Sequence, residues 1–294
     1  MTMASDAHPR TPFPSPPRAD ASVTPRLLAI DIDGTLTNSA KQIMPFTRDE
    51  IARVVATGAQ LVIVTARAIA ASMIIERKLG VPASHIAFGG GTIRVREGER
   101  LVVLEEHPFE RHDVARMLEA AAGADVHVGL YTAAEWHVSD MGFWGLREAR
   151  NTSIWPNTIG DGTPPAIPVD PVFKVMFRGD PDALAPIKAA IDRELPGAFA
   201  HFSARVLEVT ASRKHTALTS LTAHLDIDLH EVIAFGDTEA DVPMLDAAGI
   251  GVLMGNADST LTVAPHVERT LSNDEEGVGL SLRKHFPTDA PFEI

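Results

Sequence analysis

The segment Asp31-Ile32-Asp33-Gly34-Thr35-Leu36-Thr37 carries two carboxylates two residues apart, directly after a short apolar run. In an extended chain this separation puts both side chains on the same side. Gly34 permits a sharp turn and lets backbone N–H groups come close to a ligand. Taken alone, the motif fits a ligand-binding turn and an ordinary Asp-Gly turn about equally well.

A second acidic segment, Gly236-Asp237-Thr238-Glu239-Ala240-Asp241, also follows an apolar run. Magnesium prefers hard oxygen ligands and keeps several of its waters, so carboxylates at a strand end suit it. The motif by itself is explained equally well by an acidic helix N-terminus.

Two further segments offer groups that bind phosphate. Thr65-Ala66-Arg67 follows another apolar run and supplies a hydroxyl and backbone N–H groups at an expected helix start. Lys214 stands near the start of a later helix, where its ammonium can act as a point cation on phosphate. Taken singly, a helix N-cap for Thr65 and a solvated surface position for Lys214 are the more common outcomes.

The elements that must position these groups alternate between apolar strands and helices. Buried strands are predicted at Leu27–Ile30, Leu61–Val64, Ile86–Phe88, Val232–Phe235 and Ile250–Leu253. This alternation predicts an α/β fold with a Rossmann-like parallel sheet covered on both faces. Ligands bind at the carboxyl ends of the strands of such sheets, and each candidate motif follows a strand or opens a helix on that side.

Helix signals lie between the strands. Thr47-Arg48-Asp49-Glu50 has the form of a capping box, which predicts a helix start there and an end near Gly58. A second helix is expected from Ile69 to Leu79, stopped by Gly80 and Pro82.

The pattern changes in the middle of the chain. We expect residues 1–25, which hold six prolines, to form a flexible tail, and residues 26–90 and 205–294 to form the core. Residues 91–204 read as an inserted α+β domain with short strands and two helices. The helices are marked by Val114, Met117, Leu118 and Ala121, and by Leu184, Ile187 and Ile191, with a Pro- and Gly-rich loop, Trp155 to Pro171, between them.

Composition limits the function further. The 294 residues include no cysteine, which excludes thiolate catalysis and zinc–thiolate sites. No apolar run approaches the roughly 20 residues of a membrane span, and there is no secretion signal, so we expect a cytoplasmic protein. The formal net charge of −13 disfavours nucleic acid as a partner. An acidic protein that acts on phosphate must place cations locally.

Together the four motifs resemble the haloacid dehalogenase (HAD) superfamily in its Cof-type branch, whose cap domain is inserted in the middle of the core. The resemblance covers nearly all of the chain after about Arg26. It is best over Ile233 to Asn256, through Gly236-Asp237, Met244-Leu245, Ala248-Gly249-Ile250-Gly251 and Met254-Gly255-Asn256. The segment Ser272 to Val278 is similar to the family's closing segment.

The resemblance implies a magnesium-dependent phosphatase of small phosphorylated metabolites. Asp31 would be the nucleophile, and Asp33 would be the general acid and base. The phosphoryl group would be held by Gly34, Thr65, Ala66 and Lys214. The Mg²⁺ ligands would be Asp31, Asp33 through its main-chain carbonyl, Asp237 and Asp241. The inserted domain would close over the site as a cap and select the substrate.

Three positions depart from the family pattern. Gly89-Gly90 stands where the family often has Asn-Gly, Ala240 where Asn is usual, and His215 where Gly is usual. Alternatives therefore include a catalytically weak ligand-binding or regulatory protein and a phosphomutase. A dehalogenase would also use Asp31, but it protonates no leaving alkoxide, so Asp33 favours phosphoryl transfer. The sequence leaves the oligomeric state and the physiological phosphoester open.

Overall fold

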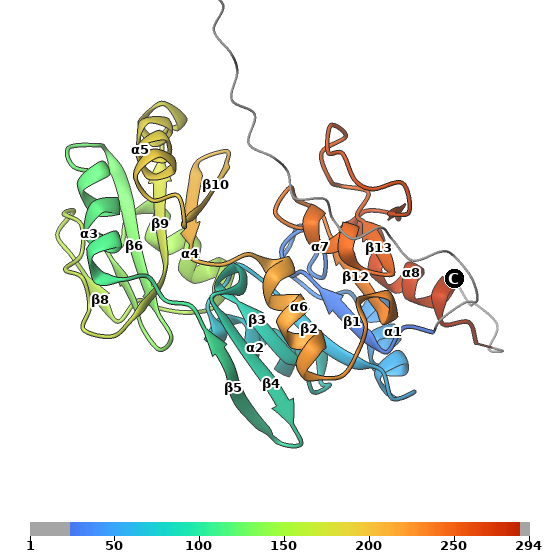
Figure 1. Cartoon of the computed structure of the whole chain (residues 1–294). Helices are drawn as coiled ribbons and strands as arrows, with labels where there is room; N and C mark the ends of the chain where they lie inside the picture. The colour runs from blue at the N-terminus through green and yellow to red at the C-terminus, as the bar shows by residue number, and fades with distance from the viewer. Residues whose placement is uncertain (1–23, 289–294) are drawn as a thin grey trace, which may run out of the picture.

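The computed structural model describes residues 24–288, which build two sheets lying side by side (Figure 1). The larger one, the core sheet, has the strand order β14-β13-β12-β1-β2-β3-β4-β5, and all neighbours are parallel except the last two pairs. Its strands are β1 (Leu27–Ile30), β2 (Gln60–Val64), β3 (Ser84–Ala87), β4 (Thr92–Glu97), β5 (Arg100–Glu106), β12 (Val232–Gly236), β13 (Ile250–Leu253) and β14 (Glu268–Arg269).

Helices cover both faces of the core sheet. One face is packed by α1 (Pro45–Val55), α2 (Ile69–Leu79) and α8 (Gly277–His285), and the other by α6 (Lys214–His224) and α7 (Val242–Ala247). The residues of β1 are all apolar because both faces of the strand are covered. Leu28 and Ile30 point to the first face, and Leu27 and Ala29 point to the second. The short 3₁₀ segments are η1 (Phe88–Gly90), η2 (Leu229–Glu231) and η3 (Asn273–Glu275).

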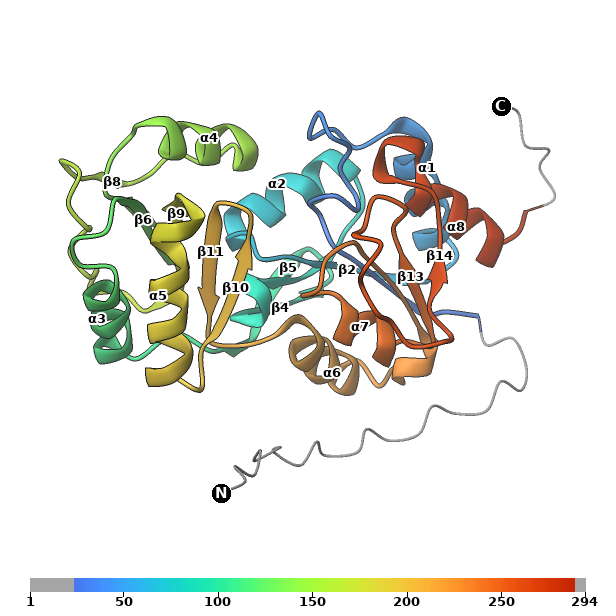
Figure 2. The same cartoon turned by 90° about the horizontal axis from the view of Figure 1, so that it is seen from above.

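The second sheet has the order β10-β11-β9-β6-β7-β8 and belongs to the region that we call the cap, Arg111–Thr210. Helices α3 (Arg111–Ala120) and α5 (Pro181–Glu194) pack on one face, whereas α4 (Phe143–Thr152) lies on the other face (Figures 1 and 2). The strands are β6 (Val126–Thr132), β7 (Trp136–Val138), β8 (Thr158–Ile159), β9 (Val172–Gly179), β10 (Phe199–Ser203) and β11 (Val206–Thr210).

An apolar cluster joins the cap to the core. Phe88 of the core stacks on Phe173 of β9 with ring centroids 5.3 Å apart. Ile69 at the start of α2 belongs to the same cluster, together with Tyr131 and Trp136 of the cap. This cluster fixes how the cap's inner face meets the core beside the ends of the core strands.

The parallel α/β core expected from the sequence is confirmed, together with a second, mixed sheet. Strands Leu27–Ile30 and Ile250–Leu253 and helix Ile69–Leu79 have the predicted bounds. Gly80 ends that helix in the left-handed conformation, with φ at 76°. The middle block holds three helices rather than the predicted two, because Phe143–Thr152 forms the additional helix α4.

The expected boundary of the inserted domain at residue 91 needs correction. The predicted insertion includes the residues of β4 and β5, but β4 pairs antiparallel with β3, and β5 pairs with β4. They therefore extend the core sheet as a hairpin. At the other edge, β11 runs to Thr210, so the cap sheet reaches beyond the predicted boundary at residue 204.

The predicted capping box is wrong. Helix α1 begins at Pro45, ahead of Thr47, and its N-cap residue makes no side-chain hydrogen bond. The Thr47 N–H instead donates to the carboxylate of Glu276, 2.6 Å away and far along the sequence. Glu50 is buried and binds Arg53 and Arg283 rather than the helix start. A distant carboxylate has replaced the local cap.

Among residues 24–288, no helix combines the length and the apolar character needed to cross a membrane. Residues 1–23, which make up most of the predicted tail, lie outside the described residues.

Candidate active site

Three neighbouring parallel strands bring the predicted residues to one edge of the core sheet. Strand β1 lies between β12 and β2. Asp31 follows β1, Thr65 follows β2, and Asp237 follows β12. Parallel strands end on the same side, so these segments meet at the carboxyl edge, as the sequence predicted.

Asp31, Asp237 and Asp241 form a compact carboxylate group. One oxygen from each lies within 4.8 Å of the others. Asp31 and Asp241 are buried, and Asp237 is half-buried. Three hard oxygen donors at this spacing fit a divalent cation such as magnesium. The donor set and the concentration of negative charge both agree with the metal site expected from the sequence.

Lys214, the first residue of α6, lies inside this acidic group. Its Nζ donates to Asp31 Oδ1 at 2.6 Å and to Asp241 Oδ1 at 2.7 Å. Burial acts to lower the pKa of Lys214, but the charges of Asp241 and Asp31 outweigh it and raise the pKa. The ammonium is therefore held charged against two carboxylates in a dry environment. Lys214 is not the solvated surface lysine that is the commoner outcome for a lone lysine.

The site shifts the pKa values of the three carboxylates in different directions. Burial raises the pKa of Asp31 well above its usual range, and the charges of Asp241 and Asp237 add to the effect, against Lys214. Burial and the charge of Asp241 raise the pKa of Asp237 to about 6. Burial also acts on Asp241, but Lys214 and hydrogen bonds from Thr238 hold its pKa below the ordinary value. A bound cation would favour the ionised form of all three.

Gly34 approaches this group more closely than any other residue type allows. A Cβ at this position would lie 2.2 Å from Asp237 Oδ2, and φ is +81°. Both the space and the left-handed backbone therefore require glycine. Its carbonyl accepts a hydrogen bond from Asn256 Nδ2 at 2.9 Å, which ties the Asp31–Gly34 loop to the far side of the site.

The carboxylate of Asp33 lies apart from this group and faces two cations. Arg67 binds it through two nitrogens, Nε to Oδ2 at 2.6 Å and Nη2 to Oδ1 at 2.7 Å, and Lys41 Nζ donates to Oδ1 at 2.8 Å. Burial acts to raise the pKa of Asp33, but these contacts, led by the Arg67 hydrogen bond, hold it well below its usual range. The Asp33 carboxylate is occupied by these two cations, so Asp33 can contribute only its main-chain carbonyl to a metal. That role stays a prediction.

The Thr65-Ala66-Arg67 segment is a loop and not a helix start. Helix α2 begins at Ile69 with Ala68 as its N-cap, so the N-cap role considered for Thr65 is wrong. Thr65 Oγ1 instead accepts a hydrogen bond from the Arg67 N–H at 3.1 Å. The Ala66 carbonyl accepts one from Lys174 of the cap at 2.9 Å.

Sequence reasoning missed several residues of the site. It gave no role to Lys41 or to the Arg67 side chain, and it did not single out Thr35 or Thr238. Thr35 Oγ1 donates to Asp237 Oδ1 at 3.1 Å, and Thr238 Oγ1 donates to Asp241 Oδ2 at 2.7 Å. Thr238 directly follows Asp237 in the sequence and Thr35 lies two residues after Asp33, so closeness to a predicted carboxylate is a signal that could have found both. Nothing in the local sequence marks Lys41.

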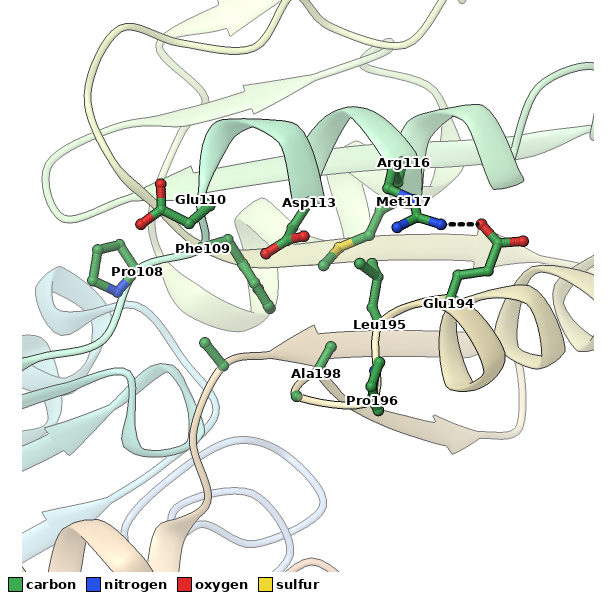
Figure 3. Close-up of a pocket in the computed structure, with 12 residues that line it drawn as sticks. Pro108, Phe109, Glu110, Asp113, Arg116, Met117, Glu194, Leu195, Pro196 and Ala198 are labelled. Atoms are coloured by element: carbon green, nitrogen blue, oxygen red, sulfur yellow. Dashed lines mark hydrogen bonds and ion pairs between the residues drawn. The ribbon is translucent and has the colours of Figure 1, made fainter.

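A separate pocket of about 290 Å³ lies on the cap (Figure 3). It is lined by α3, by the connection from α5 to β10, and by Phe109 and Ala211 on the two segments that link cap and core. Arg116 and Glu194 form an ion pair of 3.1 Å at its edge. None of the carboxylates of the Asp31 group lines it, so it is distinct from the candidate active site.

The class of HAD-like hydrolases is defined by a parallel core sheet with a cluster of carboxylates at its carboxyl edge and a cap packed beside it. The profile of the haloacid dehalogenase-like hydrolase family matches residues 28–282. The chain belongs to this family, and it is a HAD-family phosphatase of the Cof-type, as the sequence motifs indicated.

Individual relatives agree with this assignment. An HMP-PP phosphatase of Klebsiella pneumoniae is 30% identical over 253 residues, which span 83% of this chain and 89% of the relative. The crystal structure of a haloacid dehalogenase-like hydrolase from Bacteroides thetaiotaomicron has a TM-score of 0.76 at 26% identity, covering 89% of this chain and 99% of that one. A HAD subclass IIB sugar phosphatase shares the fold, with a TM-score of 0.72 at 23% identity over 89% of this chain and 98% of that one.

The pair Gly89-Gly90 departs from the family pattern only at Gly89, and the glycine that it shares with the family, Gly90, has a structural explanation. A Cβ on Gly90 would lie 2.6 Å from the Arg213 carbonyl oxygen, and φ is +112°, so glycine is required. At Gly89, where the family often has Asn, φ is +65° and the nearest atoms are those of the Thr210 side chain at 3.4 Å. This conformation is open to glycine and tolerated by Asn.

Proposed function

We propose that this chain is a magnesium-dependent phosphatase that hydrolyses small phosphate monoesters through an aspartyl-phosphate on Asp31. The observation that carries the proposal is the position of Asp31, which directly follows β1. Its carboxylate accepts a hydrogen bond from Lys214 at 2.6 Å and lies within 4.8 Å of carboxylate oxygens of Asp237 and Asp241. A nucleophile for an anionic phosphate needs cations beside it, and this site provides one and can hold another.

Magnitudes favour this arrangement over acid–base catalysis alone. Hydrolysis of phosphate monoesters can require accelerations of up to about 10²¹. A general acid or base contributes only about 10²–10⁴. Most of the acceleration must therefore come from electrostatic stabilisation and positioning. A magnesium ion held by Asp31, Asp237, Asp241 and the Asp33 carbonyl would supply positive charge beside the phosphoryl oxygens.

The reaction has two steps, formation and hydrolysis of the aspartyl-phosphate, and Asp31 and Asp33 act in both. In the first step an Asp31 oxygen bonds to phosphorus while the bond to the ester oxygen breaks, and Asp33 gives its proton to that oxygen. In the second step Asp33 takes a proton from water, whose oxygen bonds to phosphorus as the bond to Asp31 breaks. Inorganic phosphate leaves, Asp31 is again a carboxylate, and Asp33 is again protonated. Gly34, Thr65, Ala66 and Lys214 hold the phosphoryl oxygens.

The contacts of Asp33 match the second half of this cycle. Arg67 and Lys41 favour its ionised form, which is the form that accepts a proton from water. The first step needs the protonated acid, so we infer that substrate binding draws Arg67 or Lys41 away from Asp33. A phosphate group is a strong competitor for both cations.

The substrate is proposed by analogy with relatives. The similar proteins include HMP-PP phosphatases and a sugar phosphatase, so HMP-PP and sugar phosphates are the first compounds to try. Among residues 24–288, no contact specifically favours a phosphomutase.

The test is phosphate release from a panel containing HMP-PP, sugar phosphates and nucleotides, with and without Mg²⁺, for wild type and Asp31→Asn. We expect magnesium-dependent release that the substitution abolishes. Asp161→Asn, at an exposed position of the cap, is the matched control and should retain activity. Full activity of Asp31→Asn would contradict the proposed nucleophile. Tight binding of a panel compound without turnover by wild type would favour a ligand-binding protein.

A further inference from the structure

A buried lysine of the cap contacts the core where phosphate is expected to bind. Lys174 lies in β9, at the centre of the cap sheet, and is only 1% exposed. Burying an ammonium is costly unless other groups satisfy its charge and its three donors. The partners of Lys174 therefore indicate what the burial achieves.

Two of these partners belong to the cap. Nζ donates to Glu208 Oε1 at 2.9 Å, and it lies 4.4 Å from the centre of the Tyr131 ring. The third contact crosses to the core, where Nζ donates to the Ala66 carbonyl at 2.9 Å. The next residue toward the N-terminus, Phe173, stacks on Phe88 of the core, so this end of β9 is seated against the core.

The Ala66 carbonyl is the middle one of three that hold the Thr65–Arg67 loop. The Thr65 carbonyl accepts the Gly89 N–H at 2.9 Å, and the Arg67 carbonyl accepts the Phe88 N–H at 2.9 Å. Both of these bonds lie within the core. The bond to the Ala66 carbonyl comes from the cap, so it is the one that depends on where the cap sits.

This loop carries two groups that the proposed reaction uses. Thr65 provides the hydroxyl expected on the phosphoryl group, and Arg67 provides the bidentate contact to Asp33. A small displacement of such groups can lower a rate by about 10²-fold.

We propose that Lys174 is a positioning residue, which sets the Thr65–Arg67 loop in its working geometry when the cap is seated on the core. The inference rests on the proposed phosphatase function. A purely stabilising role fits less well, because an apolar side chain of similar size commonly serves stability as well as a buried ion pair does. Because the hydrogen bond to Ala66 forms only when the cap is seated on the core, seating of the cap and ordering of the Thr65–Arg67 loop are coupled.

The test compares two variants that break the same ion pair in different ways. Lys174→Met removes the contacts to both Glu208 and Ala66. Glu208→Gln removes the charge of the cap partner but leaves the ammonium able to reach Ala66. Lys174→Arg keeps the charge, and Lys188→Met, at a lysine of α5 paired with Asp192, controls for loss of a cap lysine.

We expect Lys174→Met to lower kcat for phosphate release by about 10- to 100-fold, with KM changed less than about threefold. Glu208→Gln and Lys188→Met should stay within about threefold of wild type, and Lys174→Arg should recover part of the loss. Equal losses of kcat in Lys174→Met and Glu208→Gln would show a structural ion pair only and would overturn the proposal.

Hydrogen exchange gives a readout that does not depend on turnover. In the full-length protein, amides of the 65–67 loop should exchange faster in Lys174→Met than in wild type or Glu208→Gln. Unchanged exchange in a folded Lys174→Met protein would also overturn the proposal. If wild type released no phosphate, the proposed function would fail, while the exchange comparison would still decide the role of Lys174.

Discussion

Two buried lysines, one in the core and one in the cap, differ in which groups compensate the charge of the ammonium. Lys214 is enclosed by two carboxylates of its own domain, Asp31 and Asp241. Lys174 has one carboxylate in its own domain, an aromatic face, and a carbonyl of the other domain. Both contacts of the Lys214 ammonium therefore lie within the core, whereas one of the three contacts of Lys174 crosses from the cap to the core.

The largest effect expected on the core side comes from Lys214→Met. Two buried carboxylates would face each other without their cation, so we expect a free energy of unfolding lower by about 3–5 kcal/mol and no detectable phosphate release. Urea unfolding and phosphate release measure the two effects. Added Mg²⁺ should restore part of the stability but not the activity. A Lys214→Met protein as stable as Lys174→Met would remove the distinction between the two lysines.

Gly34→Ala should produce the next largest effect. Its Cβ would displace Asp237 from the carboxylate group, so we expect about 10- to 100-fold weaker Mg²⁺ activation. Gly58→Ala is the matched control, because Gly58 also has a positive φ but its Cβ would meet no atom within 4 Å. A Mg²⁺ titration of activity compares the two. If both variants lost activation equally, backbone strain and not contact with Asp237 would be responsible.

The two cations that contact Asp33, Arg67 and Lys41, should differ in how much they contribute to kcat. Arg67 is buried and binds with two nitrogens, whereas the Lys41 side chain is 39% exposed and makes one contact. We expect Arg67→Met to lower kcat by about 10²-fold and Lys41→Met by less than about tenfold. Arg67→Lys should resemble Arg67→Met more than wild type, since an ammonium lacks the two-pronged geometry. A larger loss in Lys41→Met would reverse this ranking.

The smallest effect concerns a buried histidine outside the site. His85 is fully buried between Ser72 and Glu76, and burial lowers its pKa despite Glu76. The unfolded chain, with a pKa of about 6.5, then binds the extra proton as the pH falls. The stabilising contribution is thus complete above about pH 6.5 and is lost as the pH falls toward the folded pKa.

His85→Gln should therefore flatten the pH dependence of stability between about pH 5 and 7. Urea unfolding at several pH values measures this slope. His224→Gln, at an exposed position, should leave the slope unchanged. A slope that persists in His85→Gln would mean that another group titrates in this range.

The sequence was most informative where a signal is local. The run Leu27–Ile30 is apolar at every position because both faces of β1 are covered, and Gly80 ends α2 because it alone takes the left-handed conformation easily. Asp31 and Asp237 could be predicted because they directly follow β1 and β12, on the edge where parallel strands end, and Lys214 because it lies at the start of a helix.

What the sequence did not reveal depends on contacts between distant segments. The start of α1 is fixed by Glu276, and the state of Asp33 by Lys41 and Arg67. The β4–β5 hairpin alternates like the short strands of an inserted domain, and only its pairing with β3 assigns it to the core. Neither the partner of a strand nor a contact such as Glu276 to Thr47 can be read from local composition.

The pocket on the cap has a consequence for how this protein can be altered. Phe109, where the chain enters the cap, and Ala211, where it leaves, line the same small space (Figure 3). The two ends of the cap are therefore neighbours, and the intervening stretch is one continuous cassette. Such a cassette can be exchanged between related genes, or replaced in the laboratory, at two neighbouring junctions, provided that the new cap keeps the contacts that Phe173 and Lys174 make with the core. Asp31 and the other carboxylates of its group lie outside the exchanged stretch.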